Sequence, residues 1–256
     1  MKRLSVLLLA IALTGCAHSS PPVSQTPQGP TTILVFTRTR GFHHSSIPDA
    51  VAALRLLGKK NAFTVDATDD PSVFTGPRLA GYKAVVFLLT TGDVLDGAQQ
   101  AAFERYIAGG GGFVGVHSAS DTEYGWPWYG QLVGAFFMRH PRIQRAHVIV
   151  RDPALAATLA LPSPWIRSDE WYNFRTNPRG HVRVLLTVDE STYRGGTMGT
   201  DHPIAWCHDF GGGRAWYTAM GHSSSSYKEP LFLAHLLRGL LYASGLEAAA
   251  CPVPRS

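Results

Sequence analysis

The segment 109–121, with the sequence GGGGFVGVHSASD, constrains the fold of this chain more than any other stretch. Its four leading glycines allow the chain to leave a helix through left-handed conformations that other residues resist. The residues 113–116 then predict a short buried strand, whose glycine permits close backbone packing. Because ligands of open α/β sheets bind beyond the carboxyl ends of the strands, we expect His117, Ser118 and Asp121 to lie in a binding crevice.

Apolar runs alternate with helical periodicities around this segment. Buried strands are expected at 32–37, 63–67, 84–89 and 113–116, and helices at 47–58 and 96–108. This alternation predicts an α/β fold with a doubly wound, mostly parallel sheet. Further strands are expected at 146–151, 182–188, 204–210 and 214–218, the last two as a hairpin, before an apolar helix at 231–242. Residues 31–256 have the length of a single domain.

The N-terminus has the features of a targeting segment. Lys2 and Arg3 precede an apolar stretch, residues 4–13, that is too short to span a bilayer. The following Leu-Thr-Gly-Cys resembles the bacterial lipoprotein signal, which implies cleavage after residue 15 and lipid attachment to Cys16. An ordinary secretory peptide or an uncleaved anchor is the alternative. Ala17 is not an aspartate, so we expect an anchor in the outer membrane, facing the periplasm, with 16–30 as a flexible tether.

Charge and cysteine content indicate which partners and which disulfide bond are expected. The net charge of +5 includes two residues of the signal, and no basic run is interleaved with aromatics, so no nucleic-acid partner is expected. With Cys16 lipidated, Cys207 and Cys251 remain. They could pair in an oxidising compartment, or stay as a buried thiol and a free thiol on the tail. The sequence does not indicate an oligomeric state.

Several motifs, in order, resemble one known family. RGFHHSSI at 40–47, GGFVGVHSA at 111–119, HPIAW at 202–206 and GGRAWYTAMGH at 212–222 are similar to the motifs of ThuA-like (trehalose-utilisation) proteins. The resemblance runs from about Thr32 to Ser244. It implies the flavodoxin-like fold of class I glutamine amidotransferases and a role in bacterial sugar metabolism. One departure is that His43 stands where the family often has arginine.

The segment around His117 has the outline of a nucleophile elbow, with histidine in the nucleophile's place. An amidotransferase needs a reactive thiolate there, and none of the three cysteines is near, so glutamine hydrolysis is not expected. We expect His117 to act in catalysis with other residues at loop tips: His44, His222 and Glu170. Glu170 lies among aromatic residues, which could raise its pKa and suit it to acid or base work.

Other residues at these tips and in the aromatic loops are expected to bind the substrate. They are Arg40, Ser118, Asp121, Trp126, Trp171 and His202. Tryptophan rings could stack on the apolar face of a sugar, although packing in the core or in a lid is the alternative for each. Ser118 could instead cap a helix, and His202 could be a turn residue.

Together these features predict a lipoprotein that acts on a small carbohydrate, such as a keto-glycoside, by histidine acid/base chemistry. As an enzyme it would be a hydrolase, lyase or isomerase without a cysteine nucleophile. The alternative is a non-catalytic sugar-binding or accessory lipoprotein. No cofactor is predicted. A bound divalent metal is an alternative, because neutral imidazoles bind such ions. However, no His-x-x-x-His or His-Glu-x-x-His spacing places two ligands on one helix.

Overall fold

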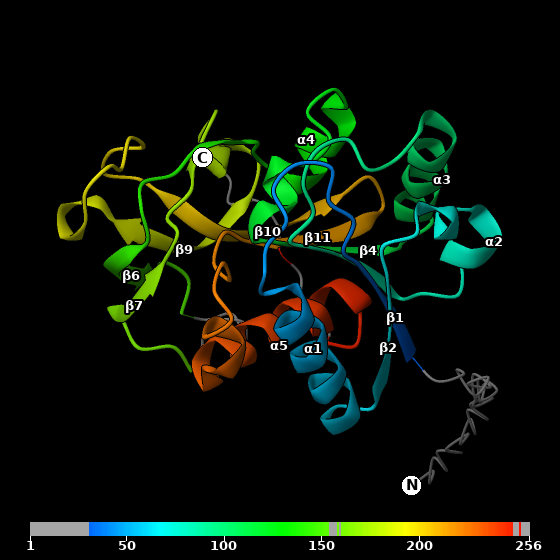
Figure 1. Ribbon diagram of the computed structural model, residues 1–256, viewed down its shortest axis with the longest axis horizontal. Coiled ribbons are helices and arrows are strands. Elements are labelled where there is room, and N and C mark those ends of the chain that lie inside the picture. The colour runs from blue at the N-terminus through cyan, green and yellow to red at the C-terminus, as the bar shows by residue number, and fades with distance from the viewer. Residues whose placement is uncertain (1–30, 154–157, 159, 248–250, 252–256) are drawn as a thin grey trace, which may run out of the picture.

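A computed structural model describes residues 31–153, 158, 160–247 and 251, and in these residues nine strands form one sheet (Figure 1). In spatial order they are β2 (Phe63–Thr68), β1 (Thr31–Phe36), β3 (Ala84–Leu88), β4 (Gly112–Val116), β11 (Gly213–Thr218), β10 (Pro203–Phe210), β9 (Arg183–Asp189), β6 (Gln144–Val150) and β7 (Trp165–Asp169). The five strands from β2 to β11 are parallel, and the other four alternate in direction. The α/β fold is confirmed, with an antiparallel extension on one side of the parallel half.

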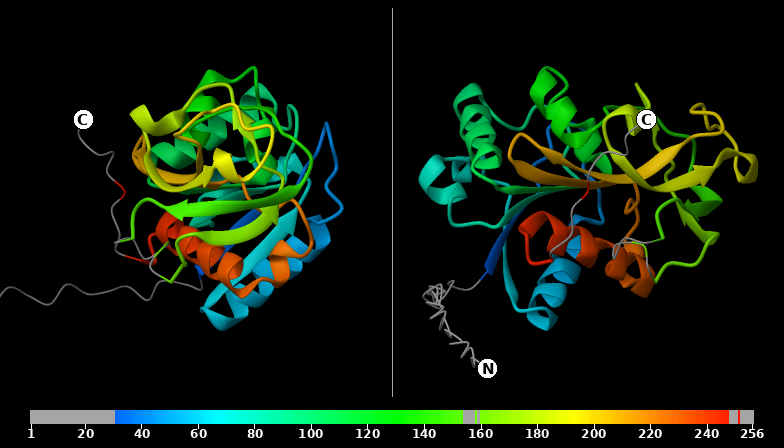
Figure 2. Two further views of the ribbon diagram at one scale, coloured as in Figure 1. Left: turned by 90° about the vertical axis from the view of Figure 1, so that its left-hand side faces the viewer. Right: turned by 180° about the vertical axis from the view of Figure 1, so that it is seen from behind.

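Helices cover both faces of the sheet (Figures 1 and 2). One face carries α1 (Ile47–Lys60) and α5 (Pro230–Ser244), and the other carries α2 (Gly76–Leu79), α3 (Gly97–Ala108) and α4 (Pro127–Val133). Two short strands, β5 (Phe137–Arg139) and β8 (Asn173–Phe174), pair separately. Single 3₁₀ turns are η1 (Pro71–Val73), η2 (His117–Asp121), η3 (Pro178–Gly180), η4 (Glu190–Thr192) and η5 (Ser226–Lys228). Because helices shield both sides, β3 and β4 are buried along their whole length.

Local sequence explains how the helices that flank β4 are placed. Asp96 and Gln99 form a capping box at the start of α3, which satisfies backbone N–H groups that the helix leaves free. Helix α5 lies close against β11, because Gly239 faces the ring of Trp216; a Cβ at this glycine would be 2.4 Å from the indole. Close packing on both sides fixes the end of β4 in the centre of the molecule.

The direction of the strands decides which loops meet. Strand β11 is parallel to β4, and four successive antiparallel pairings lead from β11 through β10, β9 and β6 to β7. Four reversals restore the original direction, so β7 runs parallel to β11. The carboxyl ends of β1, β4, β11 and β7 therefore lie at the same edge of the sheet.

Two features bear on the environment of the chain. Cys207 in β10 and Cys251 form a disulfide, with Cα atoms 5.9 Å apart, and both residues are buried. Within the described residues, no helix is long and apolar enough to cross a membrane. The predicted signal peptide (1–15), the tether (16–30) and lipidation at Cys16 lie outside the described residues.

Candidate functional site

The predicted elbow is present at the end of β4. His117 follows the strand directly, begins η2 and has a φ of 53°. A positive φ is uncommon for a residue other than glycine, and such strained residues concentrate at functional sites. Gly115, two residues earlier, has no room for a side chain, because a Cβ would lie 2.8 Å from the ring of Tyr217. The strand end therefore presents the imidazole of His117 as an elbow presents its nucleophile.

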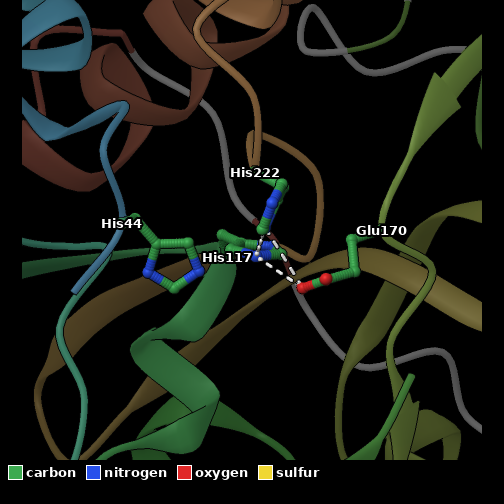
Figure 3. Close-up of side chains that lie close together, drawn as sticks. All are labelled: His44, His117, Glu170 and His222. Atoms are coloured by element: carbon green, nitrogen blue, oxygen red, sulfur yellow. Dashed lines mark hydrogen bonds and ion pairs between the residues drawn. The ribbon is translucent and has the colours of Figure 1, made fainter. Parts of the chain in front are cut away.

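The four predicted catalytic residues lie together at this elbow (Figure 3). Each of His44, His117, Glu170 and His222 offers one nitrogen or oxygen atom, and these four atoms lie within 4.8 Å of one another. Nε2 of His117 is 3.4 Å from Oε2 of Glu170 and 3.2 Å from Nδ1 of His222. The third side of this triangle, from Nδ1 of His222 to Oε2 of Glu170, is also 3.2 Å. Below, these four residues are called the histidine–glutamate cluster.

Each member of the cluster comes from a different loop at one edge of the sheet. His44 follows β1, His117 follows β4, Glu170 follows β7 and His222 follows β11. The four strand ends share that edge because their strands run in the same direction. The site thus sits beyond the carboxyl ends of the strands, as open α/β sheets place their ligand crevices.

A buried ion pair holds two of these loops in place. Asp169 is fully buried and accepts hydrogen bonds from the backbone N–H of Gly221 at 2.9 Å and of His222 at 3.2 Å. It also pairs with Arg167, whose Nη2 lies 2.9 Å from Oδ2 of Asp169. On the other side, the hydroxyl of Ser46 donates to the carbonyl oxygen of His222 at 2.7 Å. The His222 loop is therefore anchored both to the strand that precedes Glu170 and to the start of α1.

Burial and mutual contact set the charges in the cluster. Burial, with the neighbouring charges of His117 and His222, lowers the pKa of His44 to about 3. Burial would raise the pKa of Glu170, but hydrogen bonds to His117 and His222 outweigh it and hold that pKa well below its usual range. The hydrogen bond to Glu170 in turn raises the pKa of His222. The expectation of a raised pKa for Glu170 is wrong, because sequence showed its aromatic neighbours and not its histidine partners.

Two residues expected to bind substrate flank the cluster, and one lies apart from it. Ser118 is fully buried, and its hydroxyl has no hydrogen-bond partner among the described residues. Asp121 accepts a hydrogen bond from Tyr124 at 2.6 Å, and burial raises its pKa. Arg40 is exposed and lines a separate shallow pocket with His43 and Asp69.

The structure places Trp126, Trp171 and His202 in the packed interior. Trp126 stacks on neighbouring aromatic rings and donates to Glu104 at 3.0 Å, and Trp171 donates to the carbonyl of Gln144 at 2.8 Å. His202 is fully buried, with its ring nitrogens 2.8 Å from Glu190 and from the Tyr172 carbonyl. The two indole rings are almost wholly covered, so neither offers a face for a sugar to stack on.

Three residues near the cluster were not among those predicted for the site. Nδ1 of His140 lies 3.1 Å from Oε1 of Glu170, and the ring of Tyr172 lies 4.2 Å from that of His117. Phe42, with 64% of its surface exposed, meets the ring of His44 edge-on at 4.8 Å. The sequence held two usable signals: Phe42 lies within the motif at 40–47, and Tyr172 is two residues from Glu170. His140 precedes a proline and looks like a turn residue.

The cluster has two chemical capacities. Its imidazoles and carboxylate can exchange protons with a bound ligand, and their converging lone pairs can coordinate a cation. The described part of the chain places no thiol here, because Cys207 and Cys251 are joined to each other. His117 therefore stands at the elbow without a cysteine beside it among the described residues.

Comparison with known proteins agrees with the motifs. Residues 32–243 match the ThuA family model, described as trehalose utilisation. A ThuA-like protein from Bacteroides uniformis has a TM-score of 0.72 and 22% identity, over 91% of this chain and 99% of that one. One from Parabacteroides merdae has a TM-score of 0.70 and 21% identity, over 89% and 93%.

More remote structures share the fold. The chain is similar to part of a β-galactosidase from Rahnella sp. R3, with a TM-score of 0.53 and 16% identity, over 89% of this chain and 33% of that enzyme. At these identities the likeness of the solved structures shows the fold alone. None of the curated proteins matches the chain.

Proposed function

Because this chain belongs to the ThuA family, whose description is trehalose utilisation, we propose that it is an enzyme acting on a small carbohydrate. One observation carries the proposal: three imidazoles and a carboxylate from four separate loops converge within 4.8 Å at the ligand-binding edge of the sheet. A packed core rarely gathers four titratable side chains without a function, and such clusters are candidates for catalysis.

The reaction we propose is proton transfer on the sugar, without a covalent intermediate. A keto group on a glycoside would acidify the adjacent C–H bond, so that bases of ordinary strength could remove its proton. The exposed ring of Phe42 lies beside His44 and offers an apolar face to a sugar ring. Asp121 and His140 supply polar groups on the loops around the crevice.

The test is turnover by the purified full chain. Trehalose, other disaccharides and their keto derivatives would be incubated with it, and products followed by mass spectrometry. We expect turnover of at least one of them, with a loss of 100-fold or more in His117→Ala, as for removal of one catalytic proton-transfer group. His43→Ala is the matched control, because His43 is exposed and lies outside the cluster. No turnover of any of these sugars, or unchanged turnover in His117→Ala, rejects the proposal.

A non-catalytic sugar-binding lipoprotein is the second candidate, favoured by the exposed Phe42 ring at the crevice. Calorimetry separates it from the enzyme. A binding protein would bind an unaltered sugar tightly and release it unchanged after long incubation. Phe42→Ala would then weaken binding of the sugar. Neither the parent chain nor His117→Ala would convert the sugar to a product.

We also propose that the chain is held at the outer membrane, facing the periplasm, by lipid on Cys16. The N-terminal sequence supports this, and so does the Cys207–Cys251 disulfide, since disulfides persist in oxidising compartments. Labelling of cells with a tagged fatty acid should mark the chain. Cys16→Ser should abolish the label, and an equal label in that variant would refute the anchor.

A further inference from the structure

The geometry points to a divalent metal centre: we propose that His44, His117, Glu170 and His222 bind one transition-metal ion, best matched by Zn²⁺. The site itself stands on geometry alone. Its consequence for catalysis deepens the proposed function and rests on it.

Three of the four ligand atoms are already spaced as the ligands of a metal ion. The triangle formed by Nε2 of His117, Nδ1 of His222 and Oε2 of Glu170 has sides of 3.2, 3.2 and 3.4 Å. Zinc binds nitrogen and oxygen at about 2.0–2.2 Å, so two ligands of a tetrahedral ion lie about 3.3–3.6 Å apart. The triangle therefore matches one face of a zinc tetrahedron.

The hydrogen bond of His117 shows which of its nitrogens is free to coordinate. Its Nδ1 lies 2.7 Å from the carbonyl oxygen of Ala219, which can only accept, so Nδ1 carries the hydrogen. In the neutral ring, Nε2 then presents a lone pair to the cluster, opposite a carboxylate oxygen that presents lone pairs as well. Two such atoms repel unless a proton or a cation lies between them. A metal ion bound between the two atoms would remove this repulsion. The Nδ1–H bond of His117 to the Ala219 carbonyl is also typical of metal-binding histidines, which usually donate their second N–H to a carbonyl or carboxylate.

Glu170 and His222 are also oriented from outside. Oε1 of Glu170 lies 3.1 Å from Nδ1 of His140, which leaves Oε2 directed at the cluster. The loop of His222 is held by its backbone bonds to Asp169 and Ser46. Outer contacts of this kind fix the ligands of metal sites, and their loss typically weakens metal binding 10–100-fold.

His44 completes the set as the fourth ligand. It is buried, and Figure 3 shows one of its ring nitrogens turned toward His117. Its Nδ1 is buried without a hydrogen-bond partner among the described residues. No hydrogen bond of Nδ1 among the described residues therefore holds this ring in another orientation, and it packs edge-on against the rings of His117 and His222. Three imidazoles and one carboxylate suit Zn²⁺ and other first-row transition metals, whereas Mg²⁺ prefers oxygen ligands.

A bound ion would change how the proposed enzyme works. By expanding to five-coordinate, it would accept a carbonyl or hydroxyl oxygen of the sugar as a further ligand and polarise it as a Lewis acid. The four cluster residues would then be ligands, so proton transfer on the sugar would fall to groups outside the set. The substrate class that fits is a sugar that can bring a keto oxygen, or two hydroxyl oxygens together, to the ion.

The experiment is calorimetric titration of the full chain, purified in detergent without a polyhistidine tag and stripped with a chelator. Separate titrations use ZnCl₂, MnCl₂ and MgCl₂, with elemental analysis after dialysis. We expect about one equivalent of Zn²⁺, weaker binding of Mn²⁺ and none of Mg²⁺. Glu170→Gln and His222→Ala should weaken Zn²⁺ binding at least 100-fold, and His140→Ala about 10-fold. The control His43→Ala should bind as the parent chain does.

The outcomes are decisive for the metal independently of activity. Less than a tenth of an equivalent of Zn²⁺ and Mn²⁺ in the folded parent chain, or unchanged binding in both Glu170→Gln and His222→Ala, overturns the metal centre. Circular dichroism establishes that each variant is folded, and using two variants guards against one that is not. Full turnover by metal-stripped protein would overturn the catalytic role of the metal, and would leave both metal binding and the proposed function standing. Stoichiometric metal binding with no turnover of any sugar would support the metal centre and reject the proposed function.

Discussion

Asp169→Asn should destabilise the protein by about 3 kcal/mol, although the side chain changes by one atom. Asp169 is fully buried and is the acceptor for two backbone N–H groups of the His222 loop. It is also the 2.9 Å partner of Arg167, which is itself buried. Breaking a buried ion pair typically costs about 3–5 kcal/mol, because the remaining charge is left uncompensated. We expect the lower end, since Glu229 still lies 3.4 Å from Arg167.

Urea unfolding followed by circular dichroism measures this loss as a shift of the midpoint at constant slope. Asp201→Asn is the matched control. It breaks the ion pair with Arg179, whose side chain is 46% exposed, and exposed pairs contribute at most about 1 kcal/mol. If Asp169→Asn costs no more than Asp201→Asn, the buried pair does not hold the His222 loop as inferred here.

The other predictions concern packing, the disulfide and pH. Gly239→Ala should cost about 1–3 kcal/mol in urea unfolding, because its Cβ would lie 2.4 Å from the Trp216 ring; a neutral substitution would mean that α5 can move off the sheet. Cys251→Ser should lower stability by about 2–4 kcal/mol, as expected for opening a loop with a sequence separation of 44. Dithiothreitol should lower the stability of the parent chain and leave that of the variant unchanged. Burial lowers the pKa of His208 to about 4, so the unfolded chain takes up a proton first as pH falls below about 6.5. The resulting loss of stability should grow to about 3 kcal/mol at pH 4, and His208→Gln should remove that part of the pH dependence; identical pH profiles would contradict it.

Sequence was sufficient for the features that depend on local pattern. The apolar runs and the glycine segment gave the strands of the parallel half and the elbow at His117, because burial on both faces leaves a continuous apolar run. The family motifs in the loops that follow β1 and β11 identified His44 and His222. The sequence also showed that no cysteine stands near the elbow.

Other features of the site depend on contacts between distant segments. Glu170 reaches the cluster only because four antiparallel pairings return β7 to the direction of β11. Its lowered pKa and the role of His140 follow from side chains distant in sequence. The burial of Trp126 and Trp171 depends likewise on which helices and loops cover them.

The sequence alone thus determined the strands of the parallel half, the position of the elbow and three histidines of the motifs, but not β7, which carries Glu170, or α4. Only the tertiary structure decided that these histidines and Glu170 share one site, that Cys207 and Cys251 pair, and that the two tryptophans lie in the core. The physical reason is the range of the forces. Periodicity records whether each residue is buried, whereas pairing, charge and coordination depend on the residues that the fold brings beside it.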